Sequence, residues 1–303
     1  MMNLKKWLHK MCQSVWTIGF METTMDDVMG GKSYCIRWVD LPKDCWYADP
    51  FILNVTEKYI ELLVEKWSYE LEHGVIAKIT IDRKNNKIVN SKTVLQLETH
   101  LSFPAIYRKD GKVYVCPENS ESGCHNIYEY KEKNSTVEQI KCICNSPLTD
   151  AIVTDLLGEK LLFSTQSGNP NGKTLDVFRW NETNDMFEKS SVVSFNENIA
   201  RMAGHFYEHK GSIYRPAQVC NSAYGQAVSL QKVEIKNGTI EMTEIRRLYS
   251  THKRLLNGMH TFNYFQGVIV VDAWGWNAPF LRRFFVDDWG NIKSWLKWFL
   301  TVG

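Results

Sequence analysis

The chain contains no hydrophobic run long enough to span a bilayer, and no continuous apolar stretch follows its basic first residues. We therefore expect neither a membrane-spanning helix nor a secretory signal peptide. The 8 cysteines include no pair of Cys-x-x-Cys units, which excludes the usual pattern of a structural zinc site. From these absences we predict that the thiols are reduced and that the protein is cytoplasmic.

A strong charge of one sign is also missing. The formal net charge is only +2, and no basic stripe runs through the chain, so we expect no nucleic-acid partner. Aromatic residues, in contrast, are plentiful, with 11 Trp, 13 Tyr and 14 Phe. Their rings suit the core of a β fold, and their faces also suit the C–H faces of sugar rings.

A short pattern recurs five times along the chain. An apolar stretch opens beside a small or polar residue, and a turn follows eight positions later. The opening positions are Asp49, Phe103, Asp150, Ala203 and Met259, and the turns lie at Glu57, Gly111, Gly158, Gly211 and Gly267. A repeat of about 40–50 residues built from short strands is typical of a β-propeller. We therefore predict an all-β, five-bladed β-propeller with blades starting near residues 46, 100, 147, 200 and 257.

Both ends of the chain differ from the repeats. Residues 1–33 have apolar side chains at helical spacing and are predicted to form a helical leader, and residues 34–280 are predicted to form the propeller. Residues 281–303 are predicted to be a short amphipathic segment, and residues 33–40 a strand that completes the last blade. The helical ends either pack on the propeller or lie in a membrane interface, where Trp and Lys are favoured.

The repeat also predicts which side chains meet at the central channel. Asp49 and Asp150 occupy equivalent positions, and a carboxylate at the start of a buried strand is costly unless it is paired or takes part in chemistry. The second strands bring Glu65, Glu118, Thr165, Gln218 and Asp272 toward the same mouth. Nearby lie His100, Arg201, His205, Arg215, Tyr224 and His260. We expect no metal site and no cofactor, because no specific ligand motif is present.

Structural roles compete with these assignments. Either aspartate could cap a turn between blades, and lone histidines are usually satisfied core or surface residues. An arginine beside an apolar strand must find an anion. For Arg201 and Arg215 that anion is either a ligand phosphate or a neighbouring carboxylate such as Glu118 or Asp150.

Six spaced motifs resemble the N-terminal domain of glucosamine inositolphosphorylceramide transferases. They are Trp46-Tyr-Ala-Asp-Pro-Phe-Ile, His100-Leu-Ser-Phe-Pro, Pro117-Glu-Asn-Ser, Arg201-Met-Ala-Gly-His with Tyr214-Arg-Pro-Ala-Gln, Tyr224-Gly, and His260-Thr-Phe-Asn. The resemblance covers roughly residues 40–275. It implies a place among the five-bladed propellers of the glycoside hydrolase family 43 type.

In those hydrolases a first-blade Asp is the general base and a third-blade Asp tunes and orients the site, which implies these roles for Asp49 and Asp150. Their general acid is a Glu that opens the fourth blade, where this chain has Ala203-Gly204-His205. Glu118 is the candidate replacement, since glycoside hydrolysis needs an acid for the leaving group. Arg201, Arg215 and His205 instead suit the phosphate of an activated sugar.

Three functions remain open from the sequence. The first is a glycosyltransferase-type enzyme of bacterial surface polysaccharide or glycolipid biosynthesis, acting on a sugar or a phosphate-activated sugar. It would be cytoplasmic, with peripheral contact to the inner membrane through its terminal segments. The second is a glycoside hydrolase with a relocated general acid. The third is a non-catalytic glycan-binding propeller.

Overall fold

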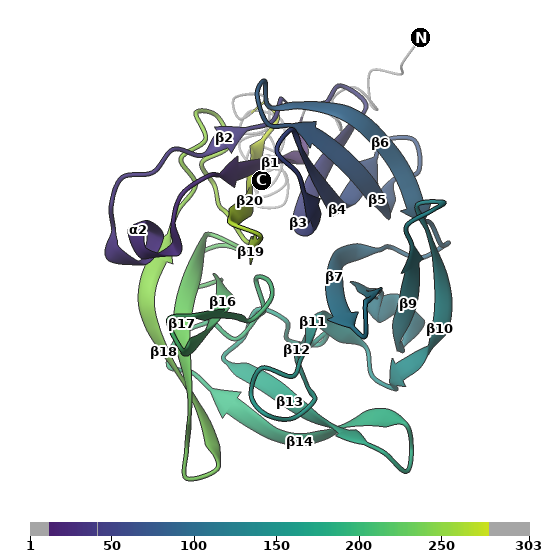
Figure 1. The fold of residues 1–303 in the computed structure, drawn as a ribbon, viewed down its shortest axis with the longest axis vertical. Helices are drawn as coiled ribbons and strands as arrows, with labels where there is room; N and C mark the ends of the chain where they lie inside the picture. The colour runs from purple at the N-terminus through teal and green to yellow at the C-terminus, as the bar shows by residue number, and fades with distance from the viewer. Residues whose placement is uncertain (1–11, 41, 279–303) are drawn as a thin grey trace, which may run out of the picture.

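The structure is a computed structural model that describes residues 12–40 and 42–278. Within these residues, 20 strands form five four-stranded sheets, and the strands of each sheet pair antiparallel. Figure 1 shows the sheets arranged as blades around a central axis, which confirms the predicted all-β, five-bladed β-propeller. No helix among the described residues is long and apolar enough to cross a membrane.

Four blades follow one another along the chain. Blade 1 consists of β3 (Cys45–Val55), β4 (Tyr59–Ser68), β5 (His73–Asp82) and β6 (Lys87–Leu95). Blade 2 consists of β7 (Ser102–Lys109), β8 (Lys112–Glu118), β9 (His125–Lys131) and β10 (Thr136–Cys144). Blade 3 consists of β11 (Leu148–Thr154), β12 (Leu161–Gln166), β13 (Thr174–Asn181) and β14 (Met186–Ser194). Blade 4 consists of β15 (Tyr207–His209), β16 (Ser212–Val219), β17 (Ala227–Lys236) and β18 (Thr239–Leu248).

Blade 5 closes the ring with strands from both ends of the described chain. Its order is β19 (Phe262–Phe265), β20 (Val268–Trp276), β1 (Ser14–Met21) and β2 (Arg37–Trp38). Strand β1 pairs with β20 along its whole length, from Ser14 opposite Trp276 to Met21 opposite Ile269. Of the strand predicted over residues 33–40, only Arg37–Trp38 forms a strand, and it is the outermost strand of the last blade.

The prediction of a helical leader over residues 1–33 is wrong for the part that the structure describes. Residues 14–21 form β1, because side chains on both faces of this strand are buried between its neighbours. Only α2 (Met25–Gly30) is helical, capped by Thr24, whose side chain accepts from the backbone N–H of Asp27 at 3.1 Å. The rest of the leader, residues 1–11, and the predicted amphipathic segment over 281–303 lie outside the described residues.

A β-bulge interrupts the first strand of each of the first three blades at the repeat's opening position. The pairing register shifts around Asp49, Phe103 and Asp150, whose φ angles are 50°, 42° and 49°. Left-handed backbone at a non-glycine residue costs roughly 1–3 kcal/mol and persists only where the surroundings enforce it. The same local distortion therefore turns the backbone at three equivalent points of the channel.

The structure contains one disulfide, between Cys124 and Cys142, with the sulfurs 1.95 Å apart. The prediction that all thiols are reduced is therefore wrong for this pair, although the other six cysteines are free. The pair forms because β9 and β10 are antiparallel neighbours, which brings Cys142 opposite Asn126 and close to Cys124. The two cysteines are 18 residues apart, and no sequence motif indicates that they lie on neighbouring strands.

Candidate functional site

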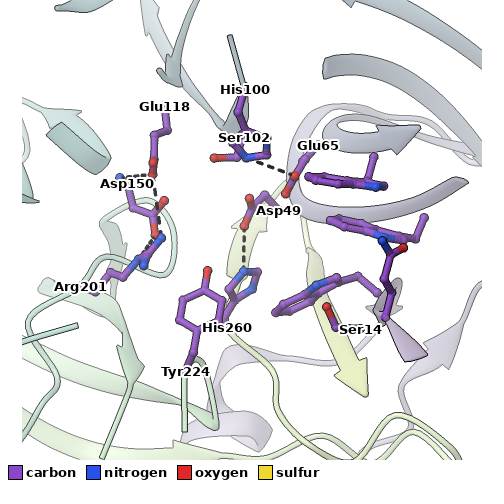
Figure 2. Close-up of a pocket in the computed structure, with 14 residues that line it drawn as sticks. Ser14, Asp49, Glu65, His100, Ser102, Glu118, Asp150, Arg201, Tyr224 and His260 are labelled. Atoms are coloured by element: carbon purple, nitrogen blue, oxygen red, sulfur yellow. Dashed lines mark hydrogen bonds and ion pairs between the residues drawn. The ribbon is translucent and has the colours of Figure 1, made fainter. Parts of the chain in front are cut away.

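A pocket of about 380 Å³ opens at the channel mouth and collects side chains from all five blades. Most of the side chains that line it are acidic, basic or aromatic, and Figure 2 shows them around one cavity. Four carboxyl groups come from Asp49, Glu65, Glu118 and Asp150; the basic groups are Arg201, His100 and His260; the tryptophans are Trp16, Trp46 and Trp67. The tryptophans can stack on a sugar ring, and the carboxyl and basic groups can bind its hydroxyls and transfer protons.

Asp49 lines the pocket and is 4% exposed. Its Oδ2 accepts from the backbone N–H of Phe103 at 3.1 Å, and its Oδ1 accepts from Thr261 Oγ1 at 2.9 Å. Burial raises the pKa of Asp49 to about 6, while the neighbouring His260 opposes that rise. A carboxylate that titrates near neutral pH and opens on a cavity is suited to general-base catalysis.

His260 and Asp272 lie beside Asp49. The backbone N–H groups of His260, Thr261 and Asp49 donate to the Asp272 carboxylate at 2.9, 3.0 and 3.3 Å. His260 Nδ1 lies 2.6 Å from Asp272 Oδ2, and its Nε2 lies 3.5 Å from Asp49 Oδ1. Burial alone would raise the pKa of Asp272, but His260 and these amides outweigh it and lower that pKa. The predicted substrate-binding role of Asp272 does not match its position, because it is fully buried and does not line the pocket.

Asp150 is held by two side chains of the fourth blade. Its Oδ2 accepts from Arg201 Nε at 2.6 Å and from Gln218 Nε2 at 2.6 Å. Arg201 also donates to Asn171 Oδ1 at 2.9 Å and lies over the Tyr224 ring at 4.8 Å. The structural alternative, a salt bridge between Arg201 and Asp150, is therefore the one observed. Gln218 is fully buried and positions Asp150; it is not a ligand group on the pocket surface.

Glu118 stands beside Asp150 on the second blade. Its Oε2 accepts from the backbone N–H of Asp150 at 3.1 Å and lies 3.9 Å from an Arg201 nitrogen. Burial and the nearby Asp150 raise the pKa of Glu118 well above its usual range, and Arg201 only partly opposes this. A carboxyl group with a raised pKa keeps its proton to higher pH, which is the property that a general acid needs.

Glu65 and His100 form a second carboxyl–histidine pair at the pocket wall. His100 Nδ1 accepts from the backbone N–H of Gly74 at 2.9 Å, so its Nε2 carries the proton of the neutral ring and faces Glu65 Oε1 at 3.6 Å. Burial, followed by the charge of Asp49, raises the pKa of Glu65 well above its usual range. A side chain at Gly74 would collide with Glu65 Oε1 and His100 Cε1 at 2.7 Å, so the pair requires glycine there.

The tryptophans form the other wall of the pocket. Trp46 and Trp67 stack in parallel, with ring centroids 5.4 Å apart and an interplanar angle of 6°. Trp16 lies 6.4 Å from Trp46 and stacks on His260 at 4.1 Å. Broad apolar faces beside carboxyl groups are the arrangement that holds a sugar ring on its C–H face.

Two further predicted ligand residues, His205 and Arg215, also lie away from the pocket. His205 Nε2 accepts from the backbone N–H of Ile106 at 3.1 Å, its ring meets Phe51 edge-on at 5.0 Å, and burial lowers its pKa to about 3. It therefore packs inside the channel as a neutral ring. Arg215 is fully buried and donates to the carbonyls of Ile199, Ala200 and Arg201, at 3.2 Å and 3.3 Å for the first and last.

Arg215 therefore does not line the pocket and contacts neither of the carboxylates considered from the sequence, Glu118 and Asp150. Its remaining partners are Gln231 Oε1 and the sulfurs of Met202 and Met242, each at 3.1 Å. Burial lowers the pKa of Arg215 to about 9. Its position beneath the segment before blade 4 makes it a brace for the backbone that carries Arg201.

Three of the described residues at this site also form a candidate metal-ligand group. Donor atoms of Asp49, His260 and Asp272 lie within 4.8 Å of one another. However, three backbone N–H groups and His260 Nδ1 already donate to the Asp272 carboxylate. The donor set is thus satisfied internally by hydrogen bonds, and its residues do not fit a metal site.

Sequence reasoning placed Asp49, Asp150, Glu118, His100, Arg201, Tyr224 and His260 at the pocket, and the structure brings these seven together. It also brought Glu65 to the channel mouth but assigned it no role, and it missed the wall of Trp16, Trp46 and Trp67. A signal for two of them was present, because Trp46 opens the first motif and Trp67 follows Glu65 on the same strand face. Trp16 carried no such signal, because its strand was assigned to a helix.

Comparison with known proteins gives the family. The sequence profile of the family "Glucosamine inositolphosphorylceramide transferase 1, N-terminal" matches residues 39–264, and the chain belongs to this family. Glucosamine inositolphosphorylceramide transferase 1 of Arabidopsis thaliana is 27% identical over 143 residues, which is 45% of this chain and 19% of that protein. The protein of the same name from Oryza sativa subsp. japonica is 25% identical over 146 residues, with the same coverage. The chain thus matches about a fifth of the length of these relatives.

Solved structures show the same fold. A structure of RS223-β-xylosidase has a TM-score of 0.52 at 11% identity, covering 77% of this chain and 93% of that chain. A glycoside hydrolase family 43 β-1,3-galactosidase, solved with galactodeoxynojirimycin, has a TM-score of 0.51 at 8% identity, covering 70% and 82%. At these identities the likeness concerns the fold alone. The family match omits β1 and β20, which supply Trp16 and Asp272.

Proposed function

We propose that the pocket binds a saccharide against its tryptophan wall and transfers a glycosyl group, with Asp49 as the general base and Glu118 as the general acid. The observation that carries this proposal is the contrast between the two carboxyl groups in one cavity. Burial raises the pKa of Asp49 to about 6, whereas burial and the nearby Asp150 raise the pKa of Glu118 well above its usual range. Two carboxyl groups with different environments are the usual equipment for breaking a glycosidic bond.

The reaction uses each group once. Asp49 accepts a proton from water or from an acceptor hydroxyl as that oxygen attacks the anomeric carbon, and the bond from this carbon to the leaving oxygen breaks. Glu118 gives its proton to the leaving oxygen. Hydrolysis and transfer to a second sugar differ only in the acceptor, so the same pocket serves both. A non-catalytic glycan-binding propeller would use the tryptophan wall without this proton transfer.

Transfer from a phosphate-activated sugar is the second candidate, and the family relationship favours it. Its phosphate would need positive charge, and Arg201 is the arginine that lines the pocket. Arg201 is already paired with Asp150, and the two other groups assigned to the phosphate, Arg215 and His205, lie elsewhere. The charge arrangement therefore supports an uncharged glycoside over a sugar phosphate.

The test compares two substrate panels on the full chain. Aryl glycosides and oligosaccharides of different sugars form one panel, and nucleotide sugars with oligosaccharide acceptors form the other. Asp49→Asn should preserve folding and reduce turnover about 10²–10⁴-fold. Wild-type turnover by this variant would exclude Asp49 as the base. Saccharide binding without turnover in either panel would identify a glycan-binding propeller.

The cellular setting is part of the proposal. A role in surface polysaccharide or glycolipid biosynthesis would place the acceptor at the cytoplasmic side of the inner membrane. The Trp- and Lys-rich terminal segments would supply the contact. Flotation with anionic liposomes tests this: the full chain should float, and removal of both ends should abolish flotation. Equal flotation after that removal would reject the membrane role of the ends.

A further inference from the structure

We propose that His260 is a buried imidazolium that positions Asp49 and balances its charge, so that the general base is a three-residue unit formed by Asp49, His260 and Asp272. The name "base unit" refers below to these three residues. The inference rests on the proposed function where it calls Asp49 the base. The protonation of the three residues is argued from their contacts and does not depend on the proposed function.

The contact between His260 and Asp272 fixes one proton. Asp272 is fully buried and accepts three backbone N–H groups, so it is a carboxylate with no proton of its own to donate. His260 Nδ1, at 2.6 Å from Asp272 Oδ2, must therefore be the donor. This places a hydrogen on Nδ1 and turns Nε2 toward Asp49 Oδ1 at 3.5 Å.

The surroundings favour a second proton on Nε2. The groups that face the ring are two aspartates, Asp272 on β20 and Asp49 on β3, with Asp150 on β11 farther away. Burial alone would lower the pKa of His260, but these carboxylates outweigh burial and raise it. Trp16 stacks on the imidazole at 4.1 Å and Tyr224 meets it edge-on at 5.3 Å, and an aromatic face attracts a cation.

The base unit holds Asp49 in two ways. Asp272 accepts the Asp49 backbone N–H at 3.3 Å and also orients His260 against the Asp49 side chain. Without the imidazolium, two buried carboxylates would face each other, and like charges at such a site raise one pKa strongly. His260 thus keeps Asp49 ionised, as a base must be, and does so at the seam where blade 1 meets blade 5.

Nuclear magnetic resonance of the full chain tests this without any substrate. With ¹⁵N-labelled histidine, both ring nitrogens of His260 should show protonated shifts at pH 7. With ¹³C-labelled aspartate carboxyl groups, the titration midpoint of Asp49 should rise by about one pH unit or more in His260→Gln. His205→Gln is the matched control, because His205 is a half-buried neutral ring that does not line the pocket. This control should leave the Asp49 midpoint unchanged.

A neutral His260 at pH 7, or an Asp49 midpoint that stays the same in His260→Gln, would overturn the proposal. Should His260→Gln fail to fold, the histidine spectrum of the unaltered protein still decides. Asp272→Asn then gives the second measurement, and its His260 should lose a proton at lower pH than in the unaltered protein. Lack of turnover on every saccharide would reject the proposed function but leave these titrations readable.

Discussion

Arg201 Nε lies 2.6 Å from Asp150 Oδ2, so the arginine that lines the pocket is already neutralised by a carboxylate. Both side chains are nearly buried, at 12% and 3% exposed. A ligand phosphate would have to compete with this pair, whereas a neutral sugar would leave it intact. Arg201 is therefore better explained as a residue that holds the Asp150 side chain in place than as a phosphate ligand.

The first prediction concerns this pair. Arg201→Gln leaves Asp150 buried without its cation, and we expect a loss of about 3 kcal/mol in the free energy of unfolding. Urea denaturation measures it. The double variant Arg201→Gln with Asp150→Asn removes both charges and should recover most of the loss. If the single and double variants are equally destabilised, the pair does not supply the stability assigned to it.

The second prediction concerns the pH dependence of stability at Asp49. Its folded pKa, about 6, lies above the unfolded value of 3.8, so the folded state binds this proton more readily. The contribution to stability is fully present below about pH 3.8 and is lost as the pH rises through 6. It amounts to on the order of 2–3 kcal/mol.

Asp49→Asn removes this titration, so it isolates the effect. Relative to this variant, the wild-type protein should gain stability as the pH falls from 7.5 to 4, measured by urea denaturation at each pH. If the difference in the free energy of unfolding between the two proteins stays constant across this range, the pKa of Asp49 is not raised in the folded state.

The propeller could be predicted because its repeat is local. Each blade repeats an apolar strand and a turn at fixed spacing, and the positions equivalent to Asp49 and Asp150 follow from counting. Closure of the ring could not be predicted in detail, because it depends on pairing between β1 and β20, which are separated by most of the chain. Trp16 and Val15 are compatible with helical spacing, and only the partner strand selects the extended form.

The site was predictable to the level of which strands reach the channel, but not to which side chains face it. Arg215 and Gln218 both lie on β16, close to the site, yet both are fully buried. Arg215 turns its guanidinium to the backbone carbonyls before Met202, and Gln218 turns its amide to Asp150. A sequence pattern with period 2 does not distinguish a side chain at the cavity surface from one just behind it.

The third prediction concerns the tryptophan wall. Trp67→Ala removes one face of the parallel stack with Trp46 and should weaken saccharide binding about 10-fold, or roughly 1.4 kcal/mol. Isothermal titration calorimetry with the best-binding oligosaccharide measures it. Trp180→Ala is the matched control, because Trp180 packs against Phe187 and Lys160 away from the pocket. Equal losses in both variants would point to a general effect on folding.

The fourth prediction separates Arg215 from ligand binding. Arg215→Lys keeps the charge but cannot reproduce the fork of hydrogen bonds to the carbonyls of residues 199–201, so stability should fall by about 2–3 kcal/mol. Thermal and urea denaturation measure the loss. The dependence of saccharide affinity on salt should stay as in the wild-type protein, because no charge in the pocket changes. A changed salt dependence would show that the charge of Arg215 contributes to ligand binding.

The last prediction concerns the boundary of the propeller. A chain that starts at residue 34 contains every residue of the family match but lacks β1, so β20 loses the partner that it pairs with along eight residues. Blade 5 would keep two adjacent strands, and Val15, Trp16 and Ile18 would no longer cover its core. We expect this chain to lose cooperative unfolding and to bind ANS, since buried apolar surface becomes exposed. A chain that starts at residue 12 is the control, because it retains β1 and should unfold in one transition. Cooperative unfolding of the shorter chain would show that the ring closes without β1, and would restore the boundary predicted from the sequence.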